Sequence, residues 1–258
     1  MNSLHKIKVM CFYTFREILK SKILVNITFL GIGLVVVTWV ASQFTHGVPS
    51  RVAIDFGFGT LTISSVGIAI FMGVGLLSKE IDTRTVYMVI SRPVPRFAFI
   101  LGKVLGLIGI LVLNIIILGI LTLSVYGFMG GKFESLIFWC FGFTILEAII
   151  ILLVVIFFSL VTNNILAVIF TIVIYIVGHA VNETYLTSMV KNNFILKNIL
   201  NAYEFVLPAF YKLNLKNEIL YQQNLPTEYL LKTLGYSFFY IGFLLFLSIS
   251  IFNKKNLD

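Results

Sequence analysis

Long, uninterrupted runs of apolar residues recur along the chain, separated by short polar stretches. A helix needs around 20 residues to cross a hydrocarbon core about 30 Å thick, and six runs approach that length. We expect membrane spans at 23–42, 56–78, 98–124, 137–161, 165–178 and 229–252, the fifth with a possible continuation to Val181. The runs are rich in Leu, Ile and Phe and lack period-two alternation, so they predict helices and not the strands of a β-barrel.

Composition leads to the same class of protein. Of the 258 residues, 59% are hydrophobic and only 12% are charged, and the mean hydropathy is +1.02. A soluble domain of this length cannot bury so much apolar surface, whereas a bilayer solvates it. The sequence therefore predicts an all-α integral membrane protein, with one transmembrane domain over 1–258.

Lysine and arginine in the polar stretches predict the orientation. They gather before the first span, between the second and third spans, and after the last: Lys6, Lys8, Arg16, Lys20, Lys22, Lys79, Arg84, Arg92, Arg96, Lys103, Lys254 and Lys255. With an even number of spans these groups share one side, which the positive-inside rule makes cytosolic, together with both termini. Four lysines in the stretch 179–228, which this orientation places outside, point the other way.

Two segments outside the spans have patterns of their own. Apolar residues recur at helical spacing over 1–22, which predicts an amphipathic helix at the membrane interface, either as a simple anchor or as a lever touching a cytosolic partner. The stretch 179–228 is too polar to span and too long for a tight turn. We expect it on the extracytoplasmic side, as interfacial helices interrupted at Pro208, where it could cap a translocation path or bind an extracytoplasmic partner.

The stretch 79–97 is the most charged part of the chain. Ser78 is a candidate N-cap for a short helix, and Glu80 and Asp82 would lie in its first turn, where carboxylates favour the positive end of the helix dipole. Arg92, which precedes Pro93, is disfavoured in the α region, so the helix should end near Ser91. These features predict a short cytosolic helix, rigidly joined to two spans and suited to receive a push from another protein.

Here the chain is similar to a known family. An acid, a threonine, an apolar run, and then Ser, Pro, Arg and Gly-Lys follow one another, at Glu80, Asp82, Thr85, Ser91, Pro93, Arg96, Gly102 and Lys103. This order resembles the signature of exporter-type (type-2) ATP-binding-cassette (ABC) transporter permeases. The segments 157–168 and 208–216 resemble the family's turn between spans four and five and its loop before the last span. Arg84 departs from the pattern, because many members have Gly before the threonine.

The resemblance implies a permease subunit that forms half of a two-permease, two-ATPase exporter in the plasma (inner) membrane of a bacterium. Its expected partners are a cytosolic ABC ATPase subunit in two copies, a second permease copy or a homologous permease, and membrane lipid. ATP and Mg²⁺ would bind the ATPase, with no cofactor on this chain. Force would pass through charge-assisted hydrogen bonds of the coupling stretch, although helix capping and membrane anchoring are alternative roles for its members. The expected coupling residues are Glu80, Asp82, Thr85, Pro93 and Arg96.

Motifs for enzymatic chemistry are not found in the sequence. The nearest approach to GxxxxGK[ST], at 127–133, has the wrong glycine spacing and Phe133 after the lysine. His5, His46 and His179 stand in no HExxH pattern, and there is no G-x-S-x-G. We therefore expect a transport subunit that is not an enzyme, without a metal site or a nucleic-acid partner.

Glu147 is the only ionisable residue deep in a predicted span, where a charge must be neutralised, paired or hydrated. Asn114 lies at similar depth in the preceding span, so the two could share a hydrogen bond. Glu147 could pin two helices together or, with Asn114, line a substrate path. Glu147 also leaves open a second class of function, a secondary transporter or channel that needs no ATPase. A third class is a non-transporting membrane anchor of a cytosolic complex. The substrate could be a lipid, peptide, drug, ion or polysaccharide.

Small residues at a spacing of four occur in two predicted spans. Gly102 and Gly106 form a GxxxG, and Ala69 with Gly73 forms a small-xxx-small pair. Such pairs let helices approach closely, but they are frequent in membrane helices and do not identify the partner.

Overall fold

The protein is described from a computed structural model, which covers residues 3–20, 23–44, 49–82, 95–186, 194–196, 198, 200, 203, 207–221 and 225–254. Within these ranges the regular elements are all helices. They are α1 (Ser3–Leu19), α2 (Ile23–Phe44), α3 (Pro49–Asp82), α5 (Arg96–Phe128), α6 (Ser135–Val161), α7 (Asn164–Leu186), the 3₁₀ turn η1 (Phe210–Lys212), α10 (Lys216–Leu220) and α11 (Thr227–Lys254).

Five helices are long and apolar enough to cross a membrane: α3, α5, α6, α7 and α11. This confirms the prediction of an all-α membrane protein that crosses the bilayer several times. The remaining candidate, α2, has 22 residues, but the apolar part with described side chains, Phe29–Ala41, is shorter than a span. The count of six spans therefore stays a prediction.

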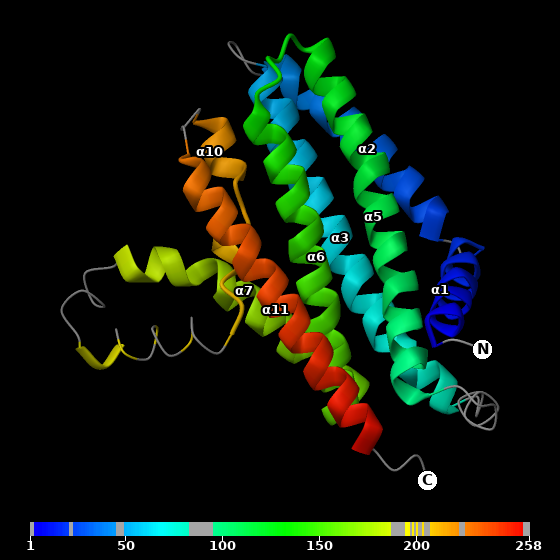
Figure 1. Ribbon diagram of the computed structural model, residues 1–258. Coiled ribbons are helices and arrows are strands. Elements are labelled where there is room, and N and C mark those ends of the chain that lie inside the picture. The colour runs from blue at the N-terminus through cyan, green and yellow to red at the C-terminus, as the bar shows by residue number, and fades with distance from the viewer. Residues whose placement is uncertain are drawn as a thin grey trace.

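Helix α6 lies at the centre of the bundle and contacts α3, α5, α7 and α11 (Figure 1). Residues 147–156 are all buried, so every face of this part of the helix is covered. Its sequence, EAIIILLVVI, is apolar all round after Glu147. A helix with that pattern has no polar face to turn outward and takes the interior position.

The two ends of the described chain lie at the same end of the bundle, which we call the terminal end (Figure 1). There the start of α5 meets the end of α11: Arg96 Nη1 donates to the Asn253 carbonyl at 3.2 Å, and the rings of Phe99 and Phe252 stack 6.2 Å apart. The connection between α5 and α6 lies at the opposite end.

The GxxxG of α5 forms a contact within the chain. Helix α1 packs along the first half of α5. A Cβ at Gly102 would lie 2.5 Å from Cβ of Met10, and one at Gly106 would lie 2.9 Å from the carbonyl oxygen of Cys11. The glycines thus let the two backbones approach closely, and this face of α5 is occupied by α1.

Two helices continue past their predicted ends. Helix α3 runs unbroken to Asp82, so the prediction that a new helix begins at Ser78 is wrong. No Pro or Gly follows Gly75 before Asp82, and nothing interrupts the hydrogen-bond ladder there. Helix α7 runs to Leu186, so residues 179–186 of the expected extracytoplasmic loop are helical.

Candidate functional site

A buried polar pair joins α6 to α7 at the middle of the bundle. Glu147 Oε1 lies 2.9 Å from Nε2 of His179, and the two side chains are 4% and 23% exposed. A carboxyl group in an apolar interior must be neutralised, paired or hydrated, and the imidazole supplies the partner. Together the two groups can hold one proton and stay neutral overall, either as carboxylic acid and imidazole or as carboxylate and imidazolium.

Aromatic rings hold the imidazole in place. The Tyr175 ring meets it edge-on, with centroids 4.7 Å apart, and the Phe210 ring stacks on it at 5.9 Å. Gly178 permits this arrangement, because a Cβ there would lie 2.7 Å from both the Pro208 carbonyl oxygen and the Phe210 ring. His179 is therefore fixed by packing as well as by its hydrogen bond.

The segment 207–215 packs against the bundle, with most of its residues buried or partly buried and Asn214 exposed. Pro208, Ala209 and Phe210 are all buried, and the segment passes beside α11 towards α10 (Figure 1). The amide of Ala209 donates to the Tyr236 hydroxyl of α11 at 3.0 Å. Backbone outside a helix is tolerated at membrane depth only where protein or water satisfies it, and Tyr236 does so here.

Asn114 forms no hydrogen bond with Glu147, so the prediction that the two residues share one is wrong. Its Oδ1 instead accepts from Ser64 Oγ of α3 at 3.2 Å. Asn114 is fully buried, and its Nδ2 has no hydrogen-bond partner among the described residues. The two candidate path residues therefore belong to different contacts, one between α5 and α3 and the other between α6 and α7.

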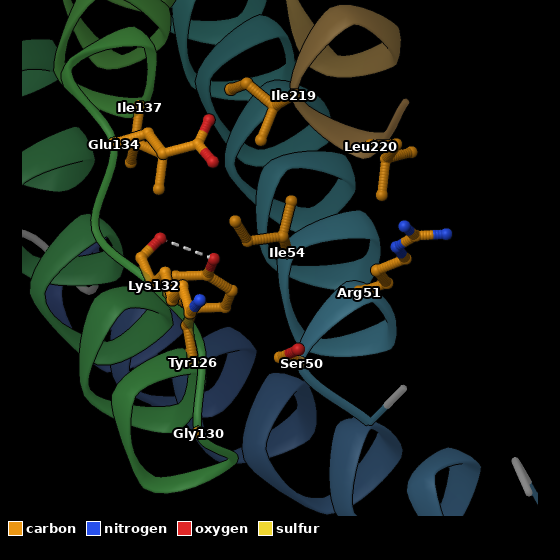
Figure 2. Close-up of a pocket in the computed structure, with 10 residues that line it drawn as sticks. All are labelled: Ser50, Arg51, Ile54, Tyr126, Gly130, Lys132, Glu134, Ile137, Ile219 and Leu220. Atoms are coloured by element: carbon orange, nitrogen blue, oxygen red, sulfur yellow. Dashed lines mark hydrogen bonds between the residues drawn. The ribbon is translucent and has the colours of Figure 1, made fainter. Parts of the chain in front are cut away.

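A polar cavity of about 230 Å³ lies at the end of the bundle opposite the terminal end. Figure 2 shows Arg51 of α3, Lys132 and Glu134 of the α5–α6 connection, and Ile54 between them. The Tyr126 hydroxyl donates to the Lys132 carbonyl at 2.8 Å and fixes the rim. The lining carries both signs of charge, as a site for water or a small polar molecule would.

Close to this cavity an ion pair ties α3 to α10. Lys216 Nζ lies 2.6 Å from Asp55 Oδ1, and both side chains are partly exposed. Because α10 follows directly on the segment 207–215, the pair anchors that segment to the helix whose other end leads to the coupling stretch.

The expected coupling residues are described only in part. Glu80 and Asp82 lie in the last turn of α3, Arg96 begins α5 and reaches Asn253, and Thr85 and Pro93 lie outside the described residues. Lys103, the lysine of the Gly-Lys pair, is 8% exposed, with its Nζ 5.3 Å from the Phe99 ring.

Sequence reasoning missed His179 as the partner of Glu147, because it ended the fifth span at Gly178. The available signal was the spacing of Tyr175 and His179, one helical turn apart in an apolar run.

Comparison with known proteins adds no further assignment: no family model matches the chain, and no curated relative matches it.

Proposed function

We propose that the protein is the permease subunit of an ABC exporter, moving an unidentified substrate with ATP hydrolysed by a separate ATPase. The observation that carries the proposal is the unbroken helix α3. It runs from the polar cavity, at Ser50 and Arg51, to Glu80 and Asp82 at the terminal end. A helix of 34 residues is stiff enough to carry a displacement along the bundle.

Contacts of α3 with α6 and α5 would transmit such a displacement to those helices. A Cβ at Gly73 would lie 3.2 Å from Leu152 Cδ1 of α6, so the two helices touch closely. Further along α3, Ser64 bonds the buried Asn114 of α5. A push on the end of α3 would therefore reach the central helix and one of the two candidate path residues.

The rest of the assembly follows from the resemblance of the coupling stretch to type-2 permeases. Two permeases and two ATPases would assemble in the bacterial plasma membrane, with the terminal end and both termini in the cytosol. ATP and Mg²⁺ would bind the ATPases, and Glu80, Asp82, Thr85, Pro93 and Arg96 would form or support the contact.

Co-purification with candidate cytosolic ATPases tests this proposal. Glu80→Lys with Asp82→Lys should abolish binding of the ATPase, because positively charged side chains would replace the carboxylates that accept charge-assisted hydrogen bonds. The matched control is Glu134→Lys with Glu228→Lys, the same change in charge at exposed acids of the opposite end, which should bind as wild type. If a folded wild-type protein binds none of the ATPases encoded with it, the exporter proposal is refuted.

A second candidate, a proton- or ion-coupled secondary transporter, is favoured by the Glu147 and His179 pair. His179, with Tyr175 and Asn214, also lines an open depression on the surface, which gives the pair a route to the outside of the bundle. Transport by liposomes that contain this chain alone, driven by a pH gradient without ATP and lost in Glu147→Gln, would select this candidate over the exporter.

A further inference from the structure

An apolar groove of about 650 Å³ lies between α6, α7 and α11. Phenylalanines line much of it, Phe157 and Phe158 from α6 and Phe239 and Phe243 from α11, and none of its lining side chains carries a charge. Pro208 and Tyr236 lie at the end nearest the middle of the bundle, and Leu247 lies towards the terminal end.

The groove has the length of one leaflet. From Tyr236 to Leu247 the axis of α11 rises about 16 Å, close to half of a hydrocarbon core about 30 Å thick. All three helices that border it are long and apolar enough to span the membrane. In a bilayer, helices of this kind face hydrocarbon, and the acyl chain of a lipid in one leaflet would fill the groove at little cost.

A lysine, Lys254, lies on the same side of α11 as the groove, at the terminal end. Lys254 follows Leu247 by seven residues, close to two helical turns, so both lie on one side of α11. Lys254 is exposed and lies where the headgroup of a lipid seated in the groove would be. Lysines beside a membrane surface attract anionic headgroups.

We propose that the groove binds one acyl chain of an anionic phospholipid from the leaflet at the terminal end, with its phosphate beside Lys254. The apolar lining favours an acyl chain, and the length of the groove matches a chain from one leaflet. Lys254 favours an anionic headgroup. This binding does not depend on what the protein transports.

Native mass spectrometry of the detergent-purified protein, titrated with phosphatidylglycerol and with phosphatidylcholine, tests the proposal. Wild type should hold one phosphatidylglycerol more tightly than phosphatidylcholine. Lys254→Glu should weaken phosphatidylglycerol at least fivefold and leave phosphatidylcholine nearly unchanged. Leu247→Trp, which fills the groove, should weaken both lipids.

Matched controls lie on the same helix. Leu231→Trp and Lys232→Glu make the same substitutions near the start of α11, outside the groove, and should bind both lipids as wild type. Equal loss in Leu247→Trp and Leu231→Trp, or an unchanged preference in Lys254→Glu, would overturn the proposal. So would a wild-type dimer that carries no lipid and separates in Leu247→Trp, since a second copy would then occupy the groove.

Discussion

At the residue scale, the interior of this protein is specified by a few polar groups that find partners. Glu147 lies against His179, Asn114 against Ser64, and the Ala209 amide against Tyr236. In an apolar bundle each unpaired polar group costs free energy, so these contacts select one packing of the helices from several that are equally apolar.

Replacing His179 by Phe should keep the ring packing and remove the partner of Glu147. We expect a loss of about 1–3 kcal/mol in the free energy of unfolding, because a buried carboxyl group loses its hydrogen bond. The double variant Glu147→Leu with His179→Phe should recover part of the loss, since neither polar group remains. Unfolding measured in detergent for both single variants and the double variant checks this.

The matched control for this cycle is the exposed pair of Glu228 and Lys232, which are 2.6 Å apart with about three quarters of each side chain exposed. Glu228→Leu should change the free energy of unfolding by no more than about 0.5 kcal/mol. A double variant less stable than His179→Phe alone would mean that the pair is not the interaction that Glu147 requires.

At the scale of elements, neighbouring helices differ in how they are held. Helix α6 is surrounded, while α1 touches the bundle mainly through α5 and leaves Phe12 and Tyr13 exposed. The contact between α1 and α5 depends on two glycines that accept no side chain without movement.

Gly106→Val should therefore displace α1, because its side chain would meet Thr14 and the backbone of Cys11. The expected cost is about 1–3 kcal/mol, and Cys11 should react faster with a maleimide, while the buried Cys140 should not. Mass spectrometry of the labelled peptides distinguishes the two thiols. Gly142→Val, at a glycine where an added Cβ would have nothing within 4 Å, should leave the labelling rates of both cysteines as in wild type. If Cys11 reacted no faster in Gly106→Val than in wild type, the close contact of α1 with α5 would be contradicted.

At the scale of the whole molecule, the shared end of α1 and α11 makes a prediction about topology. In a variant whose native cysteines are replaced, a single cysteine at the exposed Leu4, near the start of α1, or at Lys254 should be protected from an impermeant maleimide in intact cells. One at Lys132, in the connection between α5 and α6, should be labelled. Labelling at Leu4 but not at Lys254 would mean an odd number of spans, and α2 would then not cross the membrane.

Much of the architecture was predictable because a bilayer imposes a simple rule on length and hydropathy. The runs that predicted α5, α6 and α11 match the observed helices closely, since each is bounded by polar residues or a proline. The ends of α3 and α7 were predicted less well. There the helix continues into polar sequence, and polarity marks the edge of the apolar layer without breaking the backbone hydrogen bonds.

The sequence by itself determined that the chain is an all-α membrane protein, and that Glu147 needs a partner. Only the tertiary structure decided which partner that is, where the GxxxG points, and that the segment 207–215 packs against the bundle. These depend on contacts between residues far apart in the chain: His179 with Glu147, Gly106 with Thr14, and Ala209 with Tyr236. Hydropathy is a property of each residue alone, whereas a contact depends on the rotation and tilt of two helices, which packing sets.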